Sequence, residues 1–491
     1  MHNDLPMPSK STQRPLIILA TCCMSLFMVS MDVTIVNVAL PAIRRNLHAS
    51  VAGLQWSIDG YTVVVASFLL LAGSMADRLG RRRTFQAGLT LFSLGSLLCS
   101  LAPTTTALVF FRMVQALGGA MLNPVAMSII VNTFTDPKER ARAIGVWGAV
   151  FGVSMAVGPV VGGLLTQSIG WRSIFWINVP IGALALTLTA KFIPESAVKT
   201  QRRFDWFAQV LIVVALASLT SAVIDGRRSG WGSLEIVVGF AAFVVSTIVL
   251  VVHEARHTAP LVDLRFFRSL PFSAATLTAV LAFASFSSFL FLNSLYLQDA
   301  RHLQPSTAGL CTLPIAVSIA VCSPISGRLV GAGRARFALV FSGGAIAIGS
   351  FLLTFLRADT PFPHILVAYT IFGLGLGMVN APITNAAVSG MPRAQAGIAA
   401  AFASTSRQVG ASLGVALAGS IAGEAISPGF TSATHAVWWL LILLGIAIVA
   451  LGLLSTGAKA KESAARIAYL LDAAPVIDSP AIGTPAKPVL Q

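Results

Sequence analysis

The sequence predicts an all-α integral membrane protein, and three observations lead to this fold class. Of the 491 residues, 56% are hydrophobic and only 10% are charged, and the mean hydropathy is +0.82, which is more apolar surface than a soluble core can bury. Fourteen apolar runs approach the roughly 20 residues that a helix needs to cross a bilayer. Most of the 33 lysines and arginines fall between alternate runs, as expected of loops that stay in the cytoplasm.

The first run begins at Leu16 and is too long for a signal-peptide core, so we expect a retained helix. An even number of spans puts both termini in the cytoplasm, in agreement with the basic residues Lys459, Lys461 and Arg466. The predicted spans are residues 16–40, 54–76, 84–102, 107–131, 143–167, 173–193, 207–225, 233–252, 272–297, 309–330, 337–357, 363–389, 396–425 and 435–456.

A weak internal repeat predicts two similar halves. Residues 69–96 align loosely with residues 322–350, which is the pattern of secondary transporters built from parallel halves around a central site. We therefore expect a cytoplasmic tail (1–15), a six-helix bundle (16–193), a linker with two extra helices (194–260), a second six-helix bundle (261–456) and an unstructured cytoplasmic tail (457–491).

Charge and cysteine content exclude several classes of function. The net charge of +15 follows the positive-inside pattern and forms no basic stripe with interleaved aromatic residues, so we expect no nucleic-acid partner. An odd number of cysteines without a CxxC spacing predicts neither a disulfide framework nor a zinc cage. We expect no cofactor and no metal, and we interpret the five cysteines as packing residues: Cys22, Cys23, Cys99, Cys311 and Cys322.

Asp32 is a carboxylate deep inside the first apolar run, "FMVSMDVTIVNVALP" (27–41). An ionised aspartate at the centre of a membrane helix costs roughly 2.5 to 3.5 kcal/mol, so such residues are by default candidates for ion or proton paths. We expect Asp32 to bind and release a proton during transport. We expect no other acidic residue to lie so deep, because Asp59 and Glu424 fall near the outer ends of their predicted helices. The structural alternative is a carboxylate that pairs with a nearby donor such as Asn37.

The loop "GSMADRLGRRR" (73–83) is the most specific motif in the sequence. Gly80 permits a tight turn, the arginines hold the loop on the inner face, and Asp77 has cationic neighbours to pair with. A charge pair at this boundary can latch the inward gate and part when the halves move. The alternative is that the arginines only satisfy the positive-inside rule. The residues of this predicted gating motif are Gly73, Asp77, Arg78, Gly80, Arg81 and Arg82.

Two further segments carry unusual residues for membrane helices. Arg112 cannot lose its proton, so it either joins a buried polar network, where it could bias Asp32, or snorkels toward the outer interface. "GVSMAVGPVVGG" (152–163) removes side chains from one helix face and breaks one backbone hydrogen bond, which allows close helix contact and a bend. Its predicted functional residues are Gly152, Gly158, Pro159, Gly162 and Gly163.

These segments resemble the motifs of the major facilitator superfamily, over nearly all of residues 16–456. "GSMADRLGRRR" is similar to its loop signature, "LVFFRMVQALGGA" (108–120) to its helix-four arginine motif, and "GVSMAVGPVVGG" to its antiporter motif. "MDVTIVNVALP" (31–41) and "WRSIFWINVPIG" (171–182) resemble signatures of its fourteen-helix drug:proton antiporter branch. The resemblance implies two six-helix bundles plus two extra central helices, a proton-linked role for Arg112, and antiport.

Candidate substrate contacts are weaker predictions, because membrane helices carry apolar and aromatic residues routinely. Methionine and aromatic side chains give an adaptable surface suited to amphipathic or cationic compounds. The residues that we expect to line the cavity are Met28, Met31, Asn37, Trp56, Tyr61, Phe286 and Asn293.

A rival of another class comes from His253, Glu254 and His257, which fit the HExxH pattern of zinc proteases. Catalytic zinc needs a third protein ligand, and Asp263, the nearby carboxylate, lies in a sequence with no second protease signature. We therefore expect no enzyme, but a monomeric transporter in the inner membrane that exports small, amphipathic compounds in exchange for protons. A dedicated exporter of one metabolite or antibiotic is the alternative, and an importer that shares the fold stays open.

Overall fold

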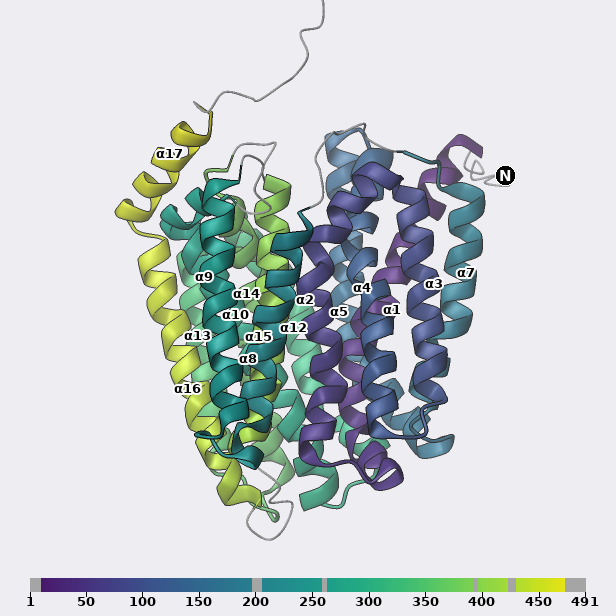
Figure 1. Ribbon diagram of the computed structural model, residues 1–491, viewed down its shortest axis with the longest axis vertical. Coiled ribbons are helices and arrows are strands. Elements are labelled where there is room, and N and C mark those ends of the chain that lie inside the picture. The colour runs from purple at the N-terminus through teal and green to yellow at the C-terminus, as the bar shows by residue number, and fades with distance from the viewer. Residues whose placement is uncertain (1–9, 197–204, 258–262, 392–395, 423–429, 473–491) are drawn as a thin grey trace, which may run out of the picture.

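The computed structural model is a bundle of long helices that run roughly parallel to one axis (Figure 1). It describes residues 10–196, 205–257, 263–391, 396–422 and 430–472, and these residues contain no β-strand. The first bundle comprises α1 (Lys10–Leu47), α2 (Val51–Leu79), α3 (Arg81–Ser100), α4 (Thr105–Thr133), α5 (Pro137–Ser168), α6 (Ser173–Trp176) and α7 (Asn178–Phe192). Two further helices follow, α8 (Trp206–Ser229) and α9 (Leu234–Arg256).

The second bundle begins after the short turn η1 (Leu264–Arg268). It comprises α10 (Leu270–Leu295), continued by η2 (Tyr296–Ala300), α11 (Pro305–Cys311), α12 (Leu313–Gly331), α13 (Ala335–Leu353), α14 (Phe362–Val388), α15 (Ala396–Ala422) and α16 (Phe430–Ser455), and α17 (Ala458–Asp472) follows it. Helices α8 and α9 pack on each other, and α8 also contacts α2 of the first bundle and α15 of the second.

Local signals explain where many helices begin. Ser50 caps α2 by accepting a hydrogen bond from the Gly53 amide at 3.1 Å, and Thr104 caps α4 through the Ala107 amide at 3.2 Å. Asp136 accepts from the Lys138 amide at 2.9 Å, and Pro137 occupies the first turn of α5, where its missing N–H costs nothing. Several serine and threonine side chains inside the spans, such as Thr21 and Ser67, bond to a carbonyl of their own helix, which satisfies their hydroxyl groups without water.

Twelve described segments are long and apolar enough to cross a membrane. Every predicted span corresponds to a helix, but 84–102 and 396–425 correspond to α3 and α15, which are not among these twelve. Both are richer in small and polar residues, and they pack against α4 and α10, respectively. Fourteen spans therefore stay a prediction.

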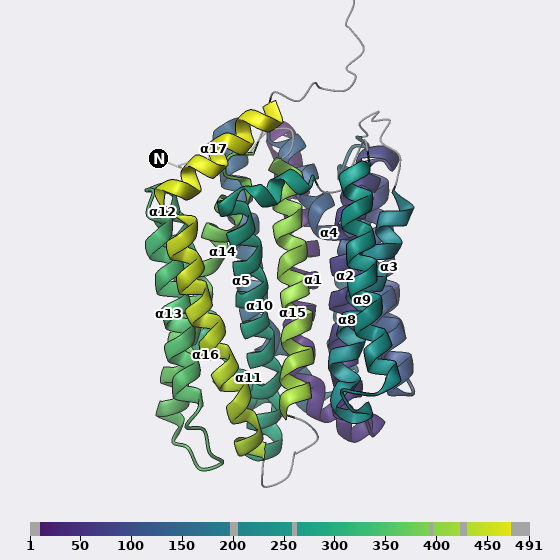
Figure 2. The same cartoon turned by 60° about the vertical axis from the view of Figure 1, so that its left-hand side comes forward.

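Part of the predicted unstructured tail is helical. Helix α17 lies across the end of the bundle, as Figure 2 shows, and the Ser463 hydroxyl accepts a hydrogen bond from the Leu270 amide at 3.1 Å. Its buried residues recur every three or four positions, the pattern of an amphipathic helix, and they are Ala460, Ala464, Ile467 and Leu471. This periodicity overrides the local polarity of residues 458–472, while residues 473–491 lie outside the described part of the chain.

The two bundles contact each other at the end opposite α17. Between α5 and α11, the Gln167 side chain donates to Gln304 Oε1 at 2.8 Å. Between α2 and α15, the Gln55 side chain donates to the Ala416 carbonyl at 2.9 Å. Arg45 lies 3.6 Å from Asp299. The bundles are therefore closed against each other at this end.

Toward the α17 end, the facing helices α5 and α12 have open space. A Cβ placed on Gly145, Gly148 or Gly152 of α5, or on Gly327 or Gly331 of α12, would meet no atom within 4 Å. Near the opposite end, by contrast, a Cβ on Gly163 would lie 2.3 Å from the Pro305 carbonyl oxygen. The seam between the bundles therefore widens from the closed end toward α17.

This asymmetry predicts a cross-linking pattern. The double variant Gln167→Cys/Gln304→Cys is expected to form a disulfide rapidly on mild oxidation, because the two side chains touch. The pair Gly145→Cys/Gly327→Cys, on α5 and on α12 in the open region, is expected to cross-link much more slowly. The five native cysteines are buried and provide little background. Equal rates for the two pairs, followed by gel mobility, would contradict this conformation.

Candidate functional site

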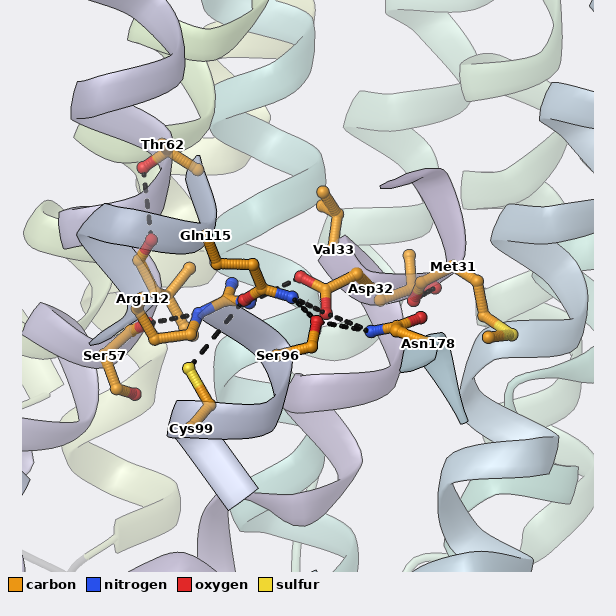
Figure 3. Close-up of polar contacts among 12 residues, drawn as sticks. Met31, Asp32, Val33, Ser57, Thr62, Ser96, Cys99, Arg112, Gln115 and Asn178 are labelled. Atoms are coloured by element: carbon orange, nitrogen blue, oxygen red, sulfur yellow. Dashed lines mark hydrogen bonds and ion pairs between the residues drawn. The ribbon is translucent and has the colours of Figure 1, made fainter. Parts of the chain in front are cut away.

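Asp32 lies in α1 at the centre of a fully buried polar network (Figure 3). Its side chain is 0% exposed. It forms an ion pair with Arg112 of α4, and it accepts hydrogen bonds from Gln115 Nε2 at 2.8 Å and Asn178 Nδ2 at 3.1 Å. The carboxylate therefore has three donors in a region without bulk water.

Arg112 belongs to this network and does not reach the interface. Its Nε donates to the Ser57 carbonyl of α2 at 3.1 Å, and its Nη1 also donates to Gln115 Oε1 at 2.7 Å. The guanidinium carbon lies 4.3 Å from the centre of the Tyr61 ring, close enough for a cation–π interaction. Of the two interpretations of Arg112, the structure supports the buried network, and snorkelling is wrong.

Sequence reasoning missed three members of this network. Gln115 lies three residues after Arg112 and so shares its helix face, a signal that was available in the sequence. Ser96 of α3 accepts from Gln115 Nε2 at 2.7 Å and from Asn178 Nδ2 at 3.3 Å. Asn178 stands within the segment 171–182, but only the packing of α3 and α7 against α1 and α4 shows what it contacts.

The structural alternative in which Asp32 pairs with Asn37 is not what the structure shows. Asn37 donates to the Val33 carbonyl of its own helix at 3.0 Å, and it lines a small cavity between the two bundles. The cavity is bounded by α1, α5, α10, η2 and α11, and Asn293 and Gln298 are among its polar residues. Asn37 and Asn293 of the predicted cavity set therefore meet at the same place.

The other predicted cavity residues are dispersed. Met31 and Phe286 lie in the large apolar core that spans both bundles, while Met28 lies in the core of the first bundle. Tyr61 stacks under Arg112 instead of facing a cavity. Trp56 packs against the cluster formed with α8 and α15. The structure brings together only part of the set.

Asp59 lies deeper than its position near a helix end indicated. It is 0% exposed, Thr62 Oγ1 donates to its Oδ1 at 3.4 Å, and it faces Ser412 of α15. The expectation that no acidic residue other than Asp32 is deeply buried is therefore wrong. Among the described side chains of the first bundle, two carboxylates are enclosed, those of Asp32 and Asp59.

The gating motif forms the junction of α2 and α3. Gly80 has a φ of +102°, which a side chain would strain, and a Cβ there would lie 2.3 Å from Glu195 Oε1. Glu195, which follows α7, accepts from the Arg82 amide at 3.2 Å and lies 3.7 Å from the Arg83 guanidinium. The predicted pairing of Asp77 falls on a side chain outside the described part of the structure.

The helix face formed by the antiporter motif packs closely on α1 and α11. A Cβ on Gly158 would lie 2.0 Å from Thr34 Oγ1, and one on Gly162 would lie 2.7 Å from the Ile35 side chain. Pro159 approaches α11, because a Cβ on Gly309 would lie 2.3 Å from the Pro159 carbonyl oxygen. Gly152 lies in open space, so its place in the motif is not explained by this contact.

The HExxH segment does not use Asp263. That carboxylate accepts from Arg265 Nη2 at 2.6 Å, whereas His253 Nε2 lies 2.7 Å from Asp205 Oδ2 at the start of α8. Burial raises the pKa of Asp205, but hydrogen bonds from the Ala208 amide and His253 outweigh it, so the pKa lies below its usual value. Asp205 is therefore ionised at neutral pH.

Comparison with known proteins decides the family. The sequence profile of the Major Facilitator Superfamily matches residues 22–415. The chain belongs to the major facilitator superfamily. This is a family of membrane transporters, so the protein is a multi-pass membrane transporter and the zinc-protease alternative is excluded.

Relatives of this superfamily member carry resistance names. The present chain is 37% identical to the multidrug resistance protein Stp of Mycobacterium tuberculosis, over 81% of this chain and 74% of that protein. It is 36% identical to the tetracenomycin C resistance and export protein of Streptomyces glaucescens, over 83% and 76%. It is 34% identical to a methylenomycin A resistance protein of Streptomyces coelicolor, over 80% and 82%.

Solved structures agree on the fold. A crystal structure of the peptide transporter POT in complex with sulfate matches with a TM-score of 0.66 at 15% identity, over 90% of this chain and 96% of that one. This likeness supports the major facilitator fold and says nothing of the substrate.

The ion pair makes a prediction about stability. Removing one partner of a buried pair strands the other charge and costs about 3–5 kcal/mol of unfolding free energy. We expect this for Arg112→Gln and also for Asp32→Asn, which keeps the shape of the side chain but leaves the Arg112 charge without its partner. The double variant should recover part of the loss, because no charge is left unpaired. Thermal unfolding in detergent measures these losses of stability. Arg334→Gln, which changes an exposed arginine, is the control. If the losses of the two single variants simply add in the double variant, the pairing is contradicted.

The antiporter motif makes a second prediction. Gly158→Ala is expected to lower the unfolding free energy by about 1–3 kcal/mol, because its methyl group would collide with Thr34 and the seam of α1 and α5 would separate. Gly152→Ala has free space and should be neutral or slightly stabilising, since alanine favours a helix. The same thermal assay compares the two, and equal effects would refute the packing argument.

Proposed function

We propose that this major facilitator protein exports small amphipathic compounds, such as drugs or antibiotics, across the cytoplasmic membrane in exchange for protons. The observation that carries the proposal is the enclosed ion pair of Asp32 and Arg112, a titratable carboxylate held against a permanent cation. The resistance and export names of its relatives support efflux as the direction of transport.

The chemistry of the pair supports proton coupling. Ionised Asp32 neutralises Arg112 and accepts hydrogen bonds from Gln115 and Asn178. A proton on Asp32 removes the only negative charge in the network, and Arg112 cannot release its own proton. The guanidinium then needs water or another partner, because an unpaired buried charge is costly. Protonation therefore favours a conformation in which this region is hydrated, and deprotonation favours the closed network.

A packed route joins the pair to the seam between the bundles. Met31 and Thr34 flank Asp32 on α1, and both lie against Gly158 of α5. The next residue, Pro159, packs against Gly309 of α11 in the second bundle. A shift of α1 caused by a change at Asp32 is thus transmitted to α5, because the small-residue face of α5 packs closely against α1 and leaves no free space. This is the role that we assign to the antiporter motif.

The gating motif acts at the α17 end. We place both termini in the cytoplasm, so that this end faces inward, and we assign the present conformation to the state that is closed to the outside and open toward the cytoplasm. Glu195 of the same bundle accepts a hydrogen bond from the Arg82 backbone amide and pairs with the Arg83 guanidinium in this state. We assign Asp77, with Arg78 and Arg81, to the latch that forms when the bundles close at this end. We assign the transport cycle to a single chain, because one chain carries both bundles.

Each proton that enters supplies about 2.3 kcal/mol per 100 mV of membrane potential. Substrate contacts are assigned to the cavity between the bundles, where Asn37 and Asn293 lie with apolar neighbours. A dedicated exporter of a single antibiotic is the second candidate, and it is favoured by relatives whose names specify tetracenomycin C or methylenomycin A.

Transport by reconstituted vesicles tests the proposal. A pH gradient should drive uptake of several dyes and antibiotics from a panel into inverted vesicles that contain the wild-type protein. Asp32→Asn, which cannot exchange a proton at that site, should abolish gradient-driven transport. Substrate-gradient-driven movement should persist, because binding does not need the carboxylate's charge to change.

The exposed carboxylate variant Glu235→Gln is the matched control and should transport normally. Full gradient-driven transport by Asp32→Asn would remove Asp32 from the coupling role. Transport of one panel member alone would favour the dedicated exporter over a multidrug protein.

A further inference from the structure

Three potential metal ligands converge where the α8–α9 hairpin begins and ends. Asp205 is the N-cap of α8, His253 lies in the last turn of α9, and His257 is its C-cap. His253 Nε2 lies 2.7 Å from Asp205 Oδ2, and His257 Nε2 lies 3.8 Å from the same oxygen. One ligand atom from each residue lies within 4.8 Å of the others.

The donor set and its spacing fit a transition metal. Two imidazoles and one carboxylate are a common protein ligand set for Zn²⁺, with bonds of about 2.0–2.2 Å. Two ligand atoms on a tetrahedral ion of that size lie roughly 3.3 Å apart. The distances from Asp205 Oδ2 to the two imidazole Nε2 atoms lie on either side of this value. Small side-chain rotations would therefore place the three ligand atoms at three corners of a tetrahedron.

The ligands are held in place by the hairpin itself. Asp205 Oδ1 accepts from the Ala208 amide at 2.9 Å, which leaves Oδ2 facing the imidazoles. The Phe207 ring lies edge-on to His253 with centroids 5.0 Å apart. The two helices approach closely further along, where a Cβ on Gly239 would lie 3.1 Å from that of Ala222. A metal would therefore find a largely preorganised site.

The site is also reachable from water. The His257 and His253 side chains are 38% and 25% exposed, while Asp205 behind them is 7% exposed. A metal ion can therefore enter from one side and keep one coordination position for water.

We propose that Asp205, His253 and His257 form a binding site for one divalent transition-metal ion of the Zn²⁺ class. No metal was predicted from the sequence, because the carboxylate near the HExxH segment is Asp263, whereas Asp205 lies 48 residues before His253. Glu254, the remaining residue of that segment, is 6% exposed, so the site binds a metal without offering an accessible base for hydrolysis. The ion would clamp together the points where the chain enters and leaves the hairpin.

Zn²⁺ titration of tag-free, full-length protein in detergent tests the site directly. After removal of metals with EDTA, isothermal titration calorimetry should show one Zn²⁺ bound per chain. His257→Gln should weaken this binding by more than the roughly 10- to 100-fold that loss of a second-shell partner costs. Asp205→Ser should do the same, and serine keeps the helix cap.

His435→Gln, which changes an exposed histidine on α16, is the matched control and should bind Zn²⁺ as the wild type does. No binding by the wild type, or the same affinity in wild type and His257→Gln, would overturn the proposal. X-ray absorption of the Zn²⁺-loaded wild type needs no variant. It should show nitrogen and oxygen ligands with two imidazoles, and sulfur ligands or fewer imidazoles would equally overturn it.

Discussion

The ion pair between Asp32 and Arg112 is the constraint around which the first bundle is arranged. Two opposite charges with almost no exposure are stable only if the remaining donors and acceptors of each are also satisfied. The Ser57 carbonyl and Gln115 complete the shell of Arg112, and Asn178 completes that of Asp32. These groups come from α1, α2, α4 and α7, with Ser96 from α3, so five helices meet at one polar point in an otherwise apolar bundle.

The same stretch of α1 connects this polar point to the seam between the bundles. One face of the helix presents Asp32 to α4, and a neighbouring face presents Thr34 and Ile35 to the glycines of α5. Because α5 also touches α11 through Pro159 and Gly163, α1 and α5 form a continuous packed path from the ion pair to the contact between the halves. A low-dielectric network and a close-packed seam thus lie next to each other, and the proposed proton coupling uses the charge of the first and the tight packing of the second.

Much of the fold and of the site could be predicted from the sequence. Long apolar runs predicted the helices, because a backbone in lipid must satisfy its hydrogen bonds within the segment. The cost of an intramembrane charge singled out Asp32 and Arg112. The predictions failed where local polarity competed with packing: residues 458–472 form an amphipathic helix, and Asp59 is fully enclosed although it lies only a few turns from the start of α2.

By itself, the sequence determined the helical membrane class, the family motifs and the residues whose charge or shape is unusual for lipid, since these depend on composition and local spacing. Only the tertiary structure decided which groups meet. Gln115, Ser96 and Asn178 complete the ion pair from three helices, and Asp205 joins His253 across a hairpin. The partners lie tens of residues apart along the chain in most of these contacts, and such contacts are set by how whole helices pack, which no local pattern specifies.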